Sequence, residues 1–263
     1  MLAIFGEIGV NPTLYYLVFG ESLLNDGIAV VFYSMMNTFT QIESGGGDVT
    51  SSQIILGICT FFTIAFGGLL IGVIFGFISA IVTKFTEQLR IVEPVVIFVI
   101  SYMSYLVADM FGWSGIISLI GCGLIQAHYA FKNISSSSQT TVEHVIEILS
   151  NLSDCIIFLY LGMALCHSQL WDTWFILWSL LICFIVRYLG VYFLTMFTGR
   201  NIDGRSQFIM GYAGLRGAVG FSLVSMISPE TVPAAPMFVT TTLAVIVCTV
   251  FVQGGSIRLL VKY

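Results

Sequence analysis

Long apolar segments, separated by short polar joints, recur along the whole sequence. Eight of them approach or exceed the roughly 20 residues that a helix needs to cross a bilayer; they are 13–39, 53–83, 94–110, 115–131, 143–166, 174–198, 207–228 and 237–258. A soluble domain has about 25% charged residues, whereas this chain has 9% charged and 57% hydrophobic residues and a mean hydropathy of +0.99. The sequence therefore predicts an all-α polytopic membrane protein with about eight transmembrane helices.

Basic residues predict how these helices cross the membrane. Seven of the nine Lys and Arg residues lie in alternate joints or at the C-terminal end, namely Lys84, Arg90, Lys132, Arg200, Arg205, Arg258 and Lys262. Cytoplasmic joints are rich in Lys and Arg, so we expect these joints and both ends of the chain to face the cytoplasm. The other two basic residues, Arg187 and Arg216, lie within apolar segments.

The first apolar segment contains the stretch GESLLNDGIAV, in which four polar residues interrupt an otherwise lipid-compatible helix. Glu21, Ser22, Asn25 and Asp26 fall within an arc of about 140° on a helix, so we expect one polar face with both acids buried. Carboxylate, amide and hydroxyl oxygens suit a small hard cation such as Na⁺. Burial favours the protonated form of Asp26 and a nearby positive charge favours the ionised form, so this carboxylate can hold either a proton or Na⁺. A polar cluster that only packs helices together is the alternative.

A second irregular stretch, GYAGLRGAVGFS, surrounds Arg216 with a glycine at every third position. So many glycines weaken a continuous helix, and the pattern predicts a broken span at Gly214 and Gly217. Broken helices expose backbone groups that bind ions in secondary transporters, and Arg216 can balance a buried acid. A glycine-rich helix that packs closely against its neighbours is the alternative.

Two further charged residues, Asp154 and Arg187, lie within apolar segments. A structural ion pair and a direct role in transport are both open for each of them. The six cysteines show no spacing typical of a zinc site or a disulfide framework, and no cofactor is expected. No basic run indicates binding of nucleic acid.

Two other functional classes can be weighed against a transporter. A cation channel also uses buried acids, but it typically has a filter or an acidic ring rather than carboxylates opposed by arginines within the spans. An intramembrane hydrolase could use Ser22 or Ser222 as its nucleophile, but it needs a base within reach. All three histidines lie near the ends of apolar segments, so we do not expect an enzyme.

The stretches FGESLLNDGIAVVFY and GYAGLRGAVGFSL together carry a resemblance to a known family. With SDCIIFLYLGM, CFIVRYLGV and FVQGGSIRLLV, they follow one another in the order found in sodium/hydrogen exchangers of the cation/proton antiporter superfamily. The resemblance implies electroneutral exchange of Na⁺ for H⁺ that regulates intracellular pH and sodium, with Li⁺ or K⁺ as further candidate ions. It also implies a thirteen-helix inverted-repeat fold, a homodimer and an elevator-type motion.

The resemblance assigns roles to individual residues. It makes Asp26 the shared site for Na⁺ and the proton, with Asn25 and Ser22 beside it. It pairs Glu21 with Arg216 of the broken helix. It divides the chain into a last helix of the first inverted repeat (1–41), a linker helix (42–93), scaffold and dimer helices (94–173) and core helices with the broken span (174–263).

The sequence departs from the family pattern at its start. MLAIFGE begins just after the point where the family carries a Thr-Asp-Pro motif on another broken helix. We therefore expect a chain truncated at both its N-terminal and C-terminal ends, for which a non-transporting remnant of an exchanger is the alternative. Resemblance to the surface-membrane branch favours the plasma membrane over an endosomal compartment.

Overall fold

The computed structural model describes residues 12–44, 51–86, 92–166, 170–197, 204–230 without 213 and 215, and 232–257. Every regular element in these residues is a helix, which confirms the all-α prediction. The chain forms two compact units, of which unit 1 comprises residues 1–26 and 157–263 and unit 2 comprises residues 27–156. Both boundaries fall within long helices, α2 (Pro12–Ser44) and α7 (Ser136–Leu165).

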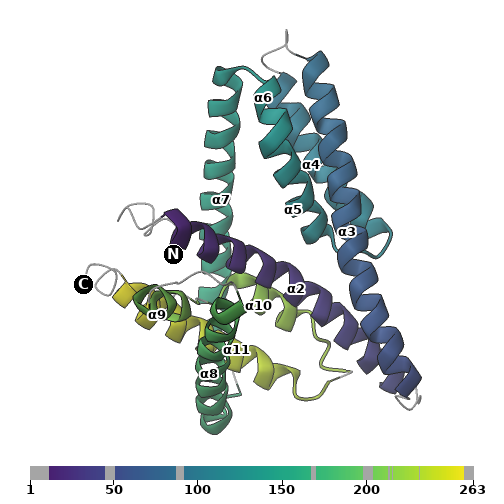
Figure 1. The fold of residues 1–263 in the computed structure, drawn as a ribbon. Helices are drawn as coiled ribbons and strands as arrows, with labels where there is room; N and C mark the ends of the chain where they lie inside the picture. Colours follow the sequence, from purple (N-terminus) through teal and green to yellow (C-terminus); the bar gives the residue numbers. More distant parts are fainter. Residues whose placement is uncertain are drawn as a thin grey trace. The chain divides into compact units, whose positions relative to one another are not determined.

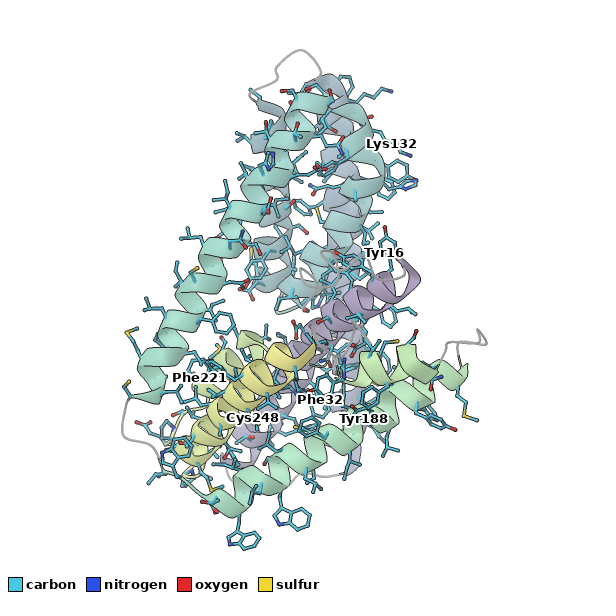
Figure 2. The ribbon with its side chains drawn as sticks, turned by 90° about the vertical axis from the view of Figure 1, so that its left-hand side faces the viewer. Tyr16, Phe32, Lys132, Tyr188, Phe221 and Cys248 are labelled. Carbon is cyan, nitrogen blue, oxygen red and sulfur yellow. The ribbon has the colours of Figure 1, made fainter. Side chains whose placement is uncertain are left out.

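Unit 2 is built around three helices that lie side by side (Figure 1). They are α3 (Ser51–Phe85), α4 (Val92–Met110) and α5 (Gly115–Ile125). The π-helical turn η1 (Gln126–Ala130) and the short helix α6 (Phe131–Asn133) continue α5. Lys132, which Figure 2 labels, is exposed on α6.

The turn between α4 and α5 depends on a glycine and a serine. Gly112 has a φ of +71°, a conformation that favours glycine. Two residues later Ser114 caps α5, and its hydroxyl accepts a hydrogen bond from the N–H of Ile117 at 3.3 Å. Together these residues reverse the chain so that α5 packs back against α3.

Small residues bring α3 and α5 into close contact. Gly68 and Gly72 lie one turn apart on α3, and a Cβ atom at either position would meet the carbonyl oxygen of Ser114 or Ser118 on α5. At Gly68 that distance would be 2.5 Å. Small residues at this spacing let helix backbones approach closely inside a membrane.

Hydrogen-bonded side chains connect α3, α4, α5 and η1. We name this set the polar seam; it consists of Ser79, Ser101, Ser104, Ser118 and Gln126. The Gln126 amide donates to the Ser79 hydroxyl and accepts from the Ser101 hydroxyl, both at 2.9 Å. The hydroxyl oxygens of Ser104 and Ser118 lie 2.6 Å apart. These bonds satisfy polar groups that would be costly to bury alone.

Unit 1 contains the remaining helices and two apolar clusters. The helices are α8 (Thr173–Phe197), α9 (Gly204–Tyr212), α10 (Ala218–Ser225), α11 (Ala235–Cys248) and the π-helical turn η2 (Thr249–Gly254). The first cluster joins Val18, Val191, Met210 and Ile257. The second joins Leu161, Phe221, Leu243 and Ile246. Figure 2 labels Phe221 on α10 and Cys248 at the end of α11.

Six helices in the described residues are long and apolar enough to cross a membrane. They contain the segments Tyr15–Thr40, Ile55–Phe85, Val92–Met110, Ser136–Leu165, Thr173–Met196 and Ala235–Ile257. The protein is therefore a multi-pass integral membrane protein, as predicted. The other two predicted segments are also helical: one comprises α5, η1 and α6, and the other is the half-helix pair α9 and α10.

Candidate functional site

Helix α2 carries the polar stretch that the sequence singled out. The helix is continuous from Pro12 to Ser44, so Glu21, Ser22, Asn25 and Asp26 occupy two successive turns of it. The exposed fraction differs among them, because Glu21 is partly buried whereas the other three side chains are exposed. The two acids therefore lie in different environments, although only five positions separate them.

Glu21 forms an ion pair with Arg187 of α8. The pair is bidentate: Nη1 of the guanidinium contacts Oε1 of the carboxylate, and Nη2 lies 2.6 Å from Oε2. Both side chains are largely withdrawn from the surface, with 23% of Glu21 and 21% of Arg187 exposed. Such a fork-to-fork arrangement fixes geometry as well as neutralising charge. The structural ion pair, one of the two alternatives for Arg187, is thus present.

Arg187 also touches the broken span. Its Nη2 donates to the carbonyl oxygen of Met210 at 3.4 Å, close to the end of α9. A Cβ atom at Gly214 would lie 2.5 Å from Arg187 Nε, so this glycine makes room for the guanidinium. The ring of Tyr188, the next residue on α8 (Figure 2), lies in the same way against Gly211. Arg187 therefore links α2, α8 and the start of the break.

The first apolar cluster holds this ion pair in place. Val18 lies three residues before Glu21 on α2, and Val191 lies four residues after Arg187 on α8. Both are therefore on the same helix faces as the charged residues. Because Val18 and Val191 are buried together with Met210, packing brings the two charged side chains to one place.

The break in the glycine-rich span is present, as predicted. Helix α9 ends at Tyr212 and α10 begins at Ala218, and Gly214 and Gly217 lie in the non-helical segment between them. The two half-helices have different neighbours, because Met210 of α9 belongs to the first apolar cluster and Phe221 of α10 belongs to the second.

Arg216 does not pair with Glu21, so the pairing implied by the resemblance is wrong in this structure. The Arg216 side chain is exposed, and its Nη2 lies 3.6 Å from the sulfur of Cys183. Glu21 is already occupied by Arg187, which reaches it from a continuous helix rather than from the break. Arg216 instead lies within electrostatic range of Asp26.

Asp26, the predicted ion-binding acid, is exposed in unit 1 rather than buried. It lies two turns beyond Val18, about 12 Å along the helix axis, and Val18 is the α2 residue that packs into the first cluster. Among the described residues, the Asp26 side chain forms no salt bridge or hydrogen bond.

The remaining predicted residues do not form a separate site. Asp154 belongs to unit 2 and is exposed on α7. No group of three or more His, Cys, Asp or Glu side chains in the described part of the chain could hold a metal ion. A cavity of about 340 Å³ lies between α8 and α9, with Tyr192 and Phe208 in its lining, and none of the predicted ion-site residues lines it.

Sequence reasoning missed the link between Glu21 and Arg187. The two residues are 166 positions apart, and no local periodicity joins them. One available signal was the presence of two mid-span arginines for one partly buried glutamate.

Comparison with known proteins identifies what the chain is similar to. The family model "Sodium/hydrogen exchanger, transmembrane" matches residues 1–263. The chain is 45% identical to "Na(+)/H(+) exchanger protein 7" of Caenorhabditis elegans, 38% to "Sodium/hydrogen exchanger 2" of Oryctolagus cuniculus and 38% to "Sodium/hydrogen exchanger 3" of Homo sapiens. Each alignment covers 100% of this chain but only 34%, 33% and 32% of these relatives. The chain thus spans about a third of their length.

Proposed function

The chain belongs to the sodium/hydrogen exchanger family, and from that premise we propose that it provides the ion-binding part of a secondary transporter that exchanges Na⁺ for H⁺. One observation supports the assignment most directly. On a single apolar helix, Glu21 is already neutralised by Arg187, while Asp26 has no salt-bridge partner among the described residues. Asp26 is therefore the acid that remains for the transported ions.

Competition for one carboxylate explains the exchange. Asp26 binds either Na⁺ or a proton, and both carry one positive charge, so each half of the cycle moves the same charge and the exchange is electroneutral. Asn25 and Ser22 supply neutral oxygens on the same helix face, which suit Na⁺ and also Li⁺ or K⁺. Arg216 lies within electrostatic range and disfavours the simultaneous binding of two cations.

Alternating access turns this competition into transport. Asp26 is exposed to one side of the membrane at a time, and Na⁺ enters the cell as a proton leaves. The break between α9 and α10 supplies a joint at which backbone groups are not committed to a helix. We further propose a homodimer in the plasma membrane that regulates intracellular pH and sodium, on the resemblance to the surface-membrane exchangers.

The test is Na⁺-dependent pH recovery in acid-loaded proteoliposomes. Three proteins are compared: the 263-residue chain, a chimera in which it replaces the matching third of the nematode exchanger, and that chimera with Asp26→Asn. Asp109→Asn, which removes an exposed acid at the end of α4, is the matched control. We expect exchange in the chimera and in the control, and recovery at background level with Asp26→Asn.

Three other outcomes of this experiment would contradict the proposal. Exchange that persists in the Asp26→Asn chimera would show that the ion site lies elsewhere. Na⁺ flux without proton movement would indicate a cation channel. A chimera without any exchange, although folded, would support a non-transporting remnant.

A further inference from the structure

Glu93 is a completely buried acid that is not part of the proposed ion site. It lies in the first turn of α4, and its exposed fraction is 0%. Among the described residues it forms no salt bridge. A buried carboxylate is costly unless nearby groups compensate its charge, so its surroundings need an explanation.

The contacts of Glu93 lead to the start of α7. Its Oε2 accepts from the backbone N–H and from the hydroxyl of Ser135, both at 3.4 Å. Ser135 in turn caps α7, because its hydroxyl oxygen accepts the N–H of Ser138 at 3.2 Å. The single Ser135 hydroxyl proton is shared between Glu93 and the Ser138 oxygen at 2.9 Å. Glu93 thus accepts hydrogen bonds from Ser135, the residue that caps α7.

Two helix N-termini converge on this carboxylate. Glu93 belongs to the first turn of α4, and Ser135 immediately precedes the first residue of α7. The positive ends of both helix dipoles stabilise a negative charge there, and they disfavour a bound cation. The contacts are long for hydrogen bonds, and Oε1 has no hydrogen-bond partner. The arrangement is a contact between the N-terminal ends of two helices rather than an ion site.

An apolar cluster completes the contact between the two helices. Ile97 lies one turn after Glu93 on α4, and it belongs to one buried apolar cluster with Ile134 and with Val142 of α7. Val142 is completely buried. Any loosening of the start of α7 from α4 would therefore expose Val142.

We infer that Glu93 is a positioning residue that holds the first turns of α7 against α4 and so fixes the direction in which the polar face of α7 points. That face carries Glu143, Glu147 and Asp154 within an arc of about 40°, and all three are exposed. Charged side chains within a span face water or protein rather than lipid. The direction of this face matters for exchange only if the proposed function holds, whereas the positioning itself does not depend on it.

The first test measures how accessible the buried cluster is. Val142→Cys is introduced into the 263-residue chain with its native cysteines replaced, and its reaction with a hydrophilic thiol reagent is timed. We expect Glu93→Ala to speed labelling about tenfold or more, as the loss of hydrogen bonds to a charged group predicts. Glu93→Gln, which keeps an acceptor oxygen, should give an intermediate rate. Glu147→Gln, which removes an exposed acid more than one turn beyond the reporter on the same helix, is the control and should leave the rate unchanged.

Unchanged labelling in Glu93→Ala would overturn the inference. Ile134→Cys, from the same cluster, is a second reporter if Val142→Cys does not fold. In the exchanging chimera, Glu93→Ala should lower the maximal rate while leaving the apparent Na⁺ affinity within twofold, because Glu93 does not contact the ion. A change in affinity alone would contradict positioning. If no variant or parent exchanges ions, the proposed function fails, and the labelling result still decides the role of Glu93.

Discussion

Two acids on one helix lie in different environments, because among the described residues only Glu21 forms an ion pair with an arginine. Glu21 is held by both nitrogens of the Arg187 fork and is partly buried. Asp26, five residues further on, is exposed and has no salt-bridge partner in the described part of the chain. A paired carboxylate is a poor site for a transported cation, whereas an unpaired one can exchange a proton for Na⁺.

We expect the Glu21–Arg187 ion pair to contribute to the free energy of unfolding. Arg187→Ala leaves Glu21 as an uncompensated, partly buried charge, and should lower the free energy of unfolding by roughly 3 kcal/mol. Unfolding of the detergent-solubilised chain, followed by helicity, measures the loss. The double variant Glu21→Gln/Arg187→Gln should be more stable than Arg187→Ala, because no lone charge remains. Arg216→Ala, which removes the exposed arginine, is the control and should change stability little.

At the residue scale, the sequence predicts which charged residues lie within the spans, but it does not predict which of them form ion pairs with one another. A polar face containing Glu21 and Asp26 follows from helical periodicity. The choice between Arg187 and Arg216 as the partner of Glu21 depends on how α8 packs against α2. The first apolar cluster, which brings together Val18 and Val191 from distant parts of the chain, is part of that packing.

At the scale of the element, the broken span contains two glycines with different neighbours. Gly214 lies against the Arg187 guanidinium, whereas no atom of the described residues, apart from the chain neighbours of Gly217, lies within 4 Å of a Cβ atom at Gly217. The first glycine therefore makes space for a neighbouring side chain, and the second does not.

This difference gives a matched pair of substitutions. Gly214→Ala should displace Arg187 from Glu21, and so lower stability and slow exchange in the chimera. Gly217→Ala should have little effect on either, because its extended backbone (φ −99°, ψ 179°) suits alanine. Thermal unfolding and Na⁺-dependent pH recovery measure the two effects. Equal effects of both substitutions would mean that flexibility of the break, not space for Arg187, is what matters.

Elements differ in how well the sequence predicts them. The long apolar segments and the glycine-rich break follow directly from composition and spacing. The π-helical turn η1 does not, and the Gln126 amide at its start bonds to Ser79 and Ser101 on two other helices. A local pattern contains no information about such contacts.

At the scale of the whole molecule, the alternation of basic joints predicts which joints face the cytoplasm. The exposed residues Ser137 and Leu170 lie in successive joints, near the two ends of α7. In a variant without native cysteines, Ser137→Cys should react with an impermeant thiol reagent only from the cytoplasmic side. Leu170→Cys should react only from the opposite side. Reaction of both from one side would reject the predicted orientation.

The sequence predicts the membrane class of the molecule better than its division into parts. Low charge and long apolar segments are sufficient for a multi-pass membrane protein. The compact units depend instead on contacts between helices distant in the chain, such as those between α3 and α5. The functional division into linker, scaffold and core helices remains a prediction.

The polar seam has a consequence for how the protein is made. Helices leave the ribosome one at a time, and each must partition from the insertion channel into lipid. The segment formed by α5, η1 and α6 is not among the six helices that are both long and apolar enough to cross a membrane, and it carries Ser118 and Gln126. Its hydrogen-bond partners, Ser79, Ser101 and Ser104, lie on α3 and α4, which are synthesised first. We therefore expect α5 to enter the bilayer by packing against α3 and α4, which are inserted before α5 is synthesised.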